Sequence, residues 1–335
     1  MHAGKSYKLS EFLFWTRRSI YVLIILGIVP VFLYHFAGLK WLNIPWPVVA
    51  LLGTATAFIV GFKNTQTYNR TEEAQQIWTT ILNLSRAWGL VSRDYFDNPA
   101  KTKDLIYGHL AWLTALRYQM REHRIWESTA KKHNAEYSRF YSIPEKEMPL
   151  KKELAKYLST EDLTYILKTG NKATHIMGLQ SRTLKELYRN EQIVLLQFVE
   201  MERGIKEFFV QQGKAEQIKD SPYPRQYAII NTLFVRLFCL LLPFGMLKEF
   251  EKLDELVDGV MKGQMVWLVV PFSIMISWMY TSLEQVGEST ENPFEGGAND
   301  VPISQMCRNM EIELREFLGE TELPLPLQAQ NNIIL

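Results

Sequence analysis

The sequence has few cysteines and almost no excess of charge of either sign. Its 335 residues include only two cysteines, Cys239 in an apolar stretch and Cys307 in a polar one, so no disulfide framework is predicted. Lysine and arginine together number 37, aspartate and glutamate 36, and the net charge is +1. Because nucleic-acid binders usually carry a basic excess on one face, we expect no nucleic-acid partner.

Signatures of soluble enzymes are also missing. The sequence has no glycine-rich phosphate loop, no His-Glu-x-x-His motif and no pair of CxxC motifs. Its six histidines are scattered, and none has a nucleophile or a metal partner at a useful spacing. We therefore predict no catalytic residue, no metal site and no enzymatic activity.

The sequence does show a strong segregation of apolar from charged residues. Four stretches are almost free of charge, at residues 19–39, 44–62, 227–247 and 265–283. Each is close to the roughly 20 apolar residues that a helix needs to cross a bilayer. We therefore predict an integral membrane protein with four transmembrane helices.

Basic residues flank these stretches unevenly. Those before the first span and after the second are Lys5, Lys8, Arg17, Arg18, Lys63 and Arg70. The link between these two spans has only Lys40. Since the cytosolic flanks of membrane helices carry the excess of lysine and arginine, we expect both termini and the middle segment in the cytosol. The predicted order is a cytosolic segment (1–18), two spans (19–62), a cytosolic domain (63–226), two more spans (227–283) and a cytosolic tail (284–335).

The long middle segment shows helical periodicity and little strand signal. Its clearest pattern is a set of apolar residues at steps of three, four or seven: Leu184, Leu187, Val194, Phe198, Met201, Ile205 and Phe208. This spacing predicts one apolar stripe on an amphipathic helix. We expect an all-α fold in which a large cytosolic helical bundle continues below the membrane.

The second span carries small residues at helical spacing. Gly53, Ala57 and Gly61 lie four residues apart and form one stripe along the helix. Small residues at this spacing let helix backbones approach closely in a bilayer. We therefore predict that this stripe packs against other helices.

A second stripe runs beside the first and consists of Thr54, Phe58 and Phe62. Such stripes are common on membrane helices, so aromatic side chains that face lipid or pack are one interpretation. The other is a pore lining, because hydrophobic constrictions control permeation by expelling water. Aromatic edges carry the positive end of the ring quadrupole and can face an anion, and the Thr54 hydroxyl could donate a hydrogen bond to a passing ion.

Arg236 is the one arginine inside a predicted span. An arginine at the centre of a span costs roughly 2.5–3.5 kcal/mol on insertion scales, so it should face protein or water. Coupled transporters and proton pumps usually place acids, histidines or broken helices at this depth, and that pattern is absent from these spans. Structural pairing or snorkelling of Arg236 and a role beside an ion path both stay open.

Several segments together resemble the bestrophin family in its bacterial branch. They lie at residues 15–21, 61–70, 222–224 and 242–245, in the family's order over about residues 8–320. The most specific segment, at residues 292–302, contains Asn292, Pro293, Phe294 and Asp300. The resemblance implies a homopentamer in the bacterial inner membrane, in which each second span lines a hydrophobic neck.

The resemblance also implies an ion channel and indicates which residues form its neck and its cytosolic aperture. The family's neck positions match Thr54, Phe58 and Phe62, although the outermost is usually a bulky aliphatic residue, so Thr54 departs from the pattern. A cytosolic aperture is expected around Leu184 or Leu187. The implied function is passage of small monovalent ions, chloride or another anion first. A monovalent cation channel and a non-conducting membrane scaffold are the alternatives.

The family's eukaryotic members hold calcium with an acidic run after Asn-Pro-Phe. This chain offers only Glu295 and Asp300, separated by four uncharged residues. Calcium takes six to eight oxygen ligands, commonly with several carboxylates, so we predict no calcium clasp and no cofactor. The expected partners are further copies of the chain, the lipid bilayer and the permeating ions. The tail after about residue 320 is either a flexible arm or a strap around a neighbour.

Overall fold

The computed structural model describes residues 1–129 and 131–335 and confirms the predicted all-α fold. Within these residues the only extended pairings are isolated bridges, such as that between His2 and Ile333. Four helices are long and apolar enough to cross a membrane. They are α1 (Leu9–His35), α2 (Trp46–Asp94), α10 (Arg225–Glu251) and α11 (Val269–Ser289). The others are α3 (Pro99–Arg121), α4 (Lys132–Tyr137), α5 (Pro144–Glu147), α6 (Leu150–Leu154), α7 (Thr160–Leu167), α8 (Lys172–Arg189), α9 (Leu195–Asp220) and α12 (Ile303–Phe317).

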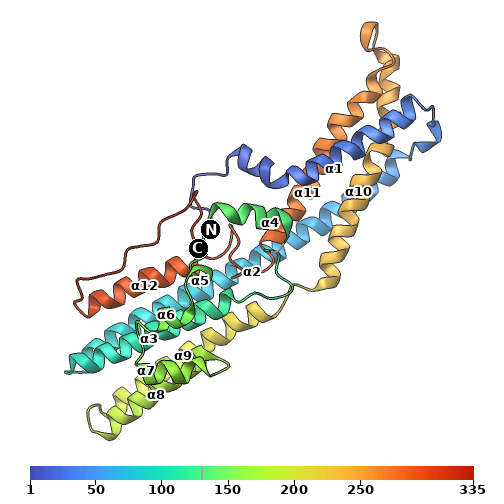
Figure 1. The fold of residues 1–335 in the computed structure, drawn as a ribbon. Helices are drawn as coiled ribbons and strands as arrows, with labels where there is room; N and C mark the ends of the chain where they lie inside the picture. The colour runs from blue at the N-terminus through green and yellow to red at the C-terminus, as the bar shows by residue number, and fades with distance from the viewer. Residues whose placement is uncertain (130) are drawn as a thin grey trace.

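The helices form two halves of an elongated molecule (Figure 1). At one end, α1, α10 and α11 lie beside the first part of α2, and we call this the membrane half. At the other end, α3, α9 and α12 pack around the later part of α2 and α8 packs on α3, and we call this the cytosolic half after its predicted location. The two chain termini lie next to each other between the halves.

The helix α2 joins the halves without a break. It is 49 residues long, with Pro47 in its first turn, where the missing N–H of proline is harmless. At 1.5 Å per residue it extends about 74 Å, more than twice the thickness of the hydrocarbon layer. The predicted boundary between residues 62 and 63 therefore falls inside one helix. Likewise α11 continues to Ser289, past the predicted end at residue 283.

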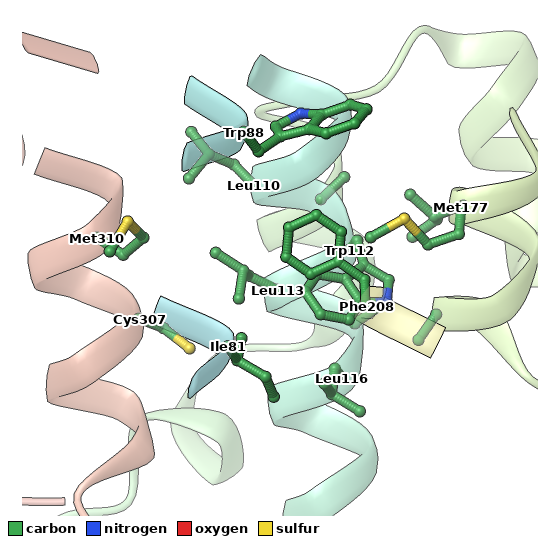
Figure 2. Close-up of a cluster of buried hydrophobic side chains, with 14 of the residues drawn as sticks. Ile81, Trp88, Leu110, Trp112, Leu113, Leu116, Met177, Phe208, Cys307 and Met310 are labelled. Atoms are coloured by element: carbon green, nitrogen blue, oxygen red, sulfur yellow. The ribbon is translucent and has the colours of Figure 1, made fainter. Parts of the chain in front are cut away.

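The cytosolic half has a large core of buried apolar side chains (Figure 2). The Trp112 and Phe208 rings are almost fully buried, with centroids 5.0 Å apart. The Trp112 indole N–H donates to Gln212 Oε1 at 2.9 Å, so the one polar atom of this ring is satisfied within the core. The cytosolic half therefore has a single close-packed interior, as expected for a domain that folds in water.

The predicted amphipathic stripe of the middle segment is buried except at Val194, which is exposed, and Phe198, which is half-buried, but the prediction of one helix is wrong. The stripe is divided between α8 and α9, which pack against each other. Between them Glu191 has a φ of 55°, a left-handed conformation that an α-helix cannot continue through. The apolar residues therefore keep their helical spacing on both sides of the turn between α8 and α9. The sequence pattern did not reveal this turn.

Candidate pore-lining site on the second membrane helix

The stripe of Thr54, Phe58 and Phe62 lies on the outer surface of the subunit. All three side chains are exposed, and Phe58 and Phe62 show 76% and 57% of their surfaces. The opposite side of α2 packs on α10 and α11. Two large aromatic rings and a threonine therefore share a face of a membrane helix that no other helix of the same subunit covers.

The Thr54 hydroxyl has a partner within its own helix. It donates to the Ala50 carbonyl at 3.0 Å, one turn earlier. Hydroxyls of threonine commonly bond the carbonyl four residues before them in membrane helices. The predicted donation from Thr54 to a passing ion is therefore not available in this rotamer, and what the side chain presents outward is its methyl group and the oxygen lone pairs.

The small-residue stripe packs within the subunit only at its first member. A Cβ added to Gly53 would lie 2.7 Å from Cε2 of Phe238 on α10, so this glycine permits a close helix crossing. Ala57 is exposed, and nothing lies within 4 Å of a Cβ added to Gly61. Residues four apart drift by about 40° round a helix, which takes the stripe away from α10. Gly61 meets no helix of its own subunit among the described residues, so its packing against another helix stays a prediction.

The helices α2 and α10 enclose an apolar recess of about 410 Å³ beside the aromatic stripe. Phe58 and Phe62 line it from α2, and Tyr227 and Ile230 line it from α10. Higher in the membrane half, Gly53 of α2 meets Phe238 of α10. The two helices therefore run antiparallel, with the exposed face of α10 next to the exposed face of α2.

Arg236 is exposed on α10, but it lies about 160° round the helix from Phe238 and therefore on the side of α10 that faces away from α2. It lies two residues before Phe238, which contacts Gly53, so its backbone is near the depth of Thr54. Across residues 1–129 and 131–335, no aspartate or glutamate forms an ion pair with it. The subunit thus presents an uncompensated positive charge at the depth of the first residue of the aromatic stripe.

A buried pair of opposite charges lies next to the end of the aromatic stripe that is nearest the cytosolic half. Lys63 follows Phe62, and its Nζ lies 3.4 Å from Glu291 Oε2, with both side chains 5% exposed. Arg225 at the start of α10 also reaches Glu291, at 3.2 Å. Sequence reasoning read Lys63 only as a cytosolic flank, and no spacing in the chain indicates its partner. The pair ties α2 to the segment after α11.

The predicted aperture residues are not available to line an opening. Leu184 is fully buried and Leu187 is 3% exposed, and both pack in the core of the cytosolic half. Their helix α8 buries its apolar face against α3 and α9, so this prediction is wrong. The exposed apolar side chains of this region are at the start of α9: Val194 (62% exposed), Leu195 (58%) and Leu196 (78%).

The motif Asn292-Pro293-Phe294 folds into a tight loop around Asp300. This carboxylate accepts backbone N–H groups from Phe294, Gly296 and Val301, each at 2.7 Å. It also pairs with Arg121 Nη1 at 2.7 Å. Phe294 has a φ of 76°, a left-handed conformation held by these bonds, and its ring packs on Trp78. Asp300 therefore organises the chain where it leaves α11.

The second acid of this segment is also engaged. Glu295 is 4% exposed and accepts hydrogen bonds from the Ser128 N–H at 2.8 Å and the Ser128 hydroxyl at 2.7 Å. Among the residues with described positions, no group of three or more histidine, cysteine, aspartate or glutamate side chains is arranged to hold a metal ion. The absence of a calcium clasp stays a prediction.

Comparison with known proteins identifies a family and a fold that match this chain. The family described as bacterial/fungal bestrophin protein matches residues 14–316. The voltage-dependent anion channel-forming protein YneE of Escherichia coli (strain K12) is 25% identical over 291 residues, which are 87% of this chain and 82% of that protein. The voltage-dependent anion channel-forming protein mll4386 of Mesorhizobium japonicum is 22% identical over 270 residues, 81% of this chain and 74% of that protein.

The solved structures show the same fold. A bacterial bestrophin homolog from Klebsiella pneumoniae matches with a TM-score of 0.75 at 21% sequence identity. The match covers 91% of this chain and 98% of that one. The arrangement of four membrane helices and a cytosolic helical body is therefore that of a known fold.

Proposed function

The chain belongs to the bacterial and fungal bestrophin family, and on this premise we propose that it forms a homopentameric channel for small monovalent anions, chloride among them. The proposed location is the bacterial inner membrane, with both termini in the cytosol. Its relatives in Escherichia coli and Mesorhizobium japonicum are named as voltage-dependent anion channel-forming proteins, which supports a channel rather than an enzyme.

The observation that carries this proposal is the exposed face of α2. Phe58 and Phe62 lie on it four residues apart, and no helix of the same subunit covers them. In the proposed pentamer, five copies of this face surround a central axis and form the neck. Rings of phenylalanine make a restriction that expels water when it is narrow and presents the positive ring edges to an anion. Because the phenylalanine rings carry no full charge, they bind ions weakly enough to release them.

Arg236 supports the choice of anions over cations. Its side chain is exposed on the side of α10 that faces away from α2, near the depth of Thr54, and no carboxylate among the described residues neutralises it. Five such charges around one axis raise the local concentration of anions and repel cations. We therefore propose that Arg236 acts on the ions through the electric field of the five subunits rather than by contact.

We place the cytosolic aperture at residues 194–196. Val194, Leu195 and Leu196 are all more than half exposed at the start of α9, while Leu184 and Leu187 are buried. A cluster of exposed aliphatic side chains in water is costly unless another surface covers it. Five copies that meet around the axis provide such a cover and form a second apolar restriction.

The test is ion flux through purified protein in liposomes. We expect anion flux from the wild type and a larger unitary conductance from the double variant Phe58→Ala, Phe62→Ala, because the restriction is wider. Phe32→Ala is the matched control: Phe32 is 51% exposed on α1, away from the proposed axis, and its loss should leave the conductance unchanged. Unchanged conductance in the double variant would reject the neck.

The same experiment separates the alternatives. A reversal potential in asymmetric potassium chloride that follows the potassium gradient would identify a cation channel of the same architecture. A wild-type protein that is folded and pentameric but passes no ions would identify a membrane scaffold.

A further inference from the structure

A cavity of about 250 Å³ lies where the start of α1 meets α4 and the loop after α11. No residue of α2, α8, α9 or α10 lines it, so it is separate from the proposed ion path. Its wall is rich in aromatic side chains from two segments of the chain, residues 7–15 and 137–141: Tyr7, Phe12, Trp15, Tyr137 and Tyr141. Aromatic faces arranged around a small space are the usual surroundings of a bound organic cation.

Two carboxylates line the same cavity, and no lysine, arginine or histidine does. Glu295 is 4% exposed, and its only partners among the described residues are the N–H and the hydroxyl of Ser128. Neither Glu295 nor Glu11 is in an ion pair with any side chain of the described chain. A buried carboxylate without a cation is unfavourable, and a bound cation would remove that cost.

Several hydrogen-bond acceptors of the wall are already in use, and Glu11 is the lining carboxylate without a side-chain partner among the described residues. Asn299 Oδ1 accepts from the Tyr7 hydroxyl at 2.7 Å, and Asn134 Oδ1 accepts from the Trp15 indole N–H at 3.2 Å. Both oxygens of Glu295 accept from Ser128. A primary ammonium needs three acceptors, whereas a quaternary ammonium needs none. The wall therefore suits a cation that is recognised by charge and by aromatic faces.

We propose that this cavity binds a quaternary ammonium group. The same chemistry is offered by a free solute of the choline type and by the head group of a zwitterionic lipid. The aromatic side chains would contact the methyl groups, and Glu295 and Glu11 would balance the charge. A desolvated cation–π contact stabilises a complex, and several rings act together in such sites.

The ionisation of Glu295 supports the same assignment. Burial raises its pKa to about 8, and the charges of Asp300 and Glu127 act in the same direction. These two acids have their own cations, Arg121 and Lys219, and the three tyrosines of the wall carry no charge at neutral pH. A bound ammonium stabilises the ionised form of Glu295, so binding releases a proton and the affinity should increase from pH 6 to pH 8.

The test is isothermal titration calorimetry of the full-length protein in maltoside micelles. Choline is the probe, and 3,3-dimethylbutanol, its neutral isostere, is the control ligand. We expect saturable binding of choline and binding of the neutral alcohol that is at least about tenfold weaker, because the alcohol lacks the charge. Equal binding of the two ligands would show a merely apolar cavity and overturn the proposal, as would no binding of choline up to about 10 mM, near the weak limit of specific sites.

Two variants locate the site. Glu295→Gln retains a group that can bond Ser128 but removes the charge, and it should weaken choline binding about tenfold. Glu161→Gln on α7 removes the same charge from an exposed position outside the cavity and should bind like the wild type. If Glu295→Gln does not fold, Tyr137→Leu takes its place, with an expected loss of about fivefold. Wild-type affinity in a folded cavity variant would overturn the proposal.

A last comparison identifies the source of the ammonium group. In nanodiscs of phosphatidylcholine, a lipid head group in the cavity would weaken the binding of free choline relative to nanodiscs of phosphatidylglycerol. Equal affinity in both would identify a soluble ligand, and both results support the site. Because the readout is binding, it does not depend on ion flux, and a failure of the proposed channel function leaves it unaffected.

Discussion

The two halves of the molecule bury their apolar residues to different extents. In the spans, only 22–44% of the most apolar window is buried within the subunit. In the cytosolic half, Trp112 and Phe208 are almost completely buried (Figure 2), and so is Trp78. Water drives complete burial in the cytosolic half, whereas a bilayer gives apolar side chains no such drive. One chain therefore completes its cytosolic core alone and leaves its membrane half to lipid and to neighbouring subunits.

The sharpest test of this difference is to remove one phenylalanine from each half. Phe208→Ala should lower the free energy of unfolding by about 3–5 kcal/mol, because it opens a cavity beside Trp112 and His109. Phe32→Ala, on the exposed face of α1, should change it by less than about 1 kcal/mol. Urea unfolding in detergent, followed by circular dichroism, measures both. Similar losses from the two variants would contradict the comparison.

The dependence of stability on pH should come from the buried groups of the cytosolic side. The pKa of Glu295 is about 8 in the folded protein, against 4.5 for an ordinary glutamate, and burial is the main cause. The folded state therefore holds a proton that the unfolded chain has lost, and stability should fall as the pH rises from 4.5 to 8. The contribution is on the order of 5 kcal/mol.

Glu295→Gln removes this group and should flatten the pH dependence in that window. Thermal unfolding of the wild type and of the variant between pH 5 and pH 9 measures the difference. Parallel curves for the two proteins would show that Glu295 is not buried as the structure places it.

Alanine variants of Gly53 and Gly61 distinguish helix contacts within a subunit from helix contacts between subunits. Gly53→Ala should destabilise the fold by about 1–3 kcal/mol, because the new methyl group would lie 2.7 Å from Phe238. Gly61→Ala meets nothing in its own subunit, so the fold should be unaffected or gain up to about 1 kcal/mol of helix stability.

If Gly61 lies against a neighbouring α2, its variant should instead weaken the oligomer. Native mass spectrometry in detergent counts the subunits of both variants. An intact pentamer in Gly61→Ala would place this glycine on an open surface.

The smallest effect on stability and a clear effect on selectivity are expected for Arg236. Arg236→Gln should leave the free energy of unfolding within about 0.5 kcal/mol, because the side chain is exposed and makes no ion pair among the described residues. If the five charges of the proposed pentamer act on the ions through their electric field, their loss should lower the preference for chloride over potassium several-fold. Reversal potentials in a tenfold salt gradient measure this. An unchanged reversal potential would place Arg236 away from the ions.

The sequence predicted the parts of the fold that depend on local pattern. The charge-free stretches marked all four membrane helices, and the spacing of Thr54, Phe58 and Phe62 put these residues on one helix face, which is exposed in the subunit. The neck itself stays a prediction, because it needs five subunits. The continuity of α2 past residue 62 was missed because hydropathy falls there while the helix does not end.

The errors have a common origin. The period that identified Leu184 and Leu187 as apolar is the same for a buried core and for an apolar opening, and only packing against α3 and α9 decides between them. The small-residue stripe was also correct as a pattern, but its rotation round the helix removed Gly61 from the contact with α10.

By itself the sequence determined the class of the protein, its membrane segments and the faces of its helices, because hydropathy and periodicity are properties of neighbouring residues. Only the tertiary structure decided which charges meet, such as Lys63 with Glu291 and Arg121 with Asp300. It alone also assembled the aromatic cavity from α1, α4 and the loop after α11. These contacts join residues more than a hundred positions apart, and their formation depends on how whole helices pack.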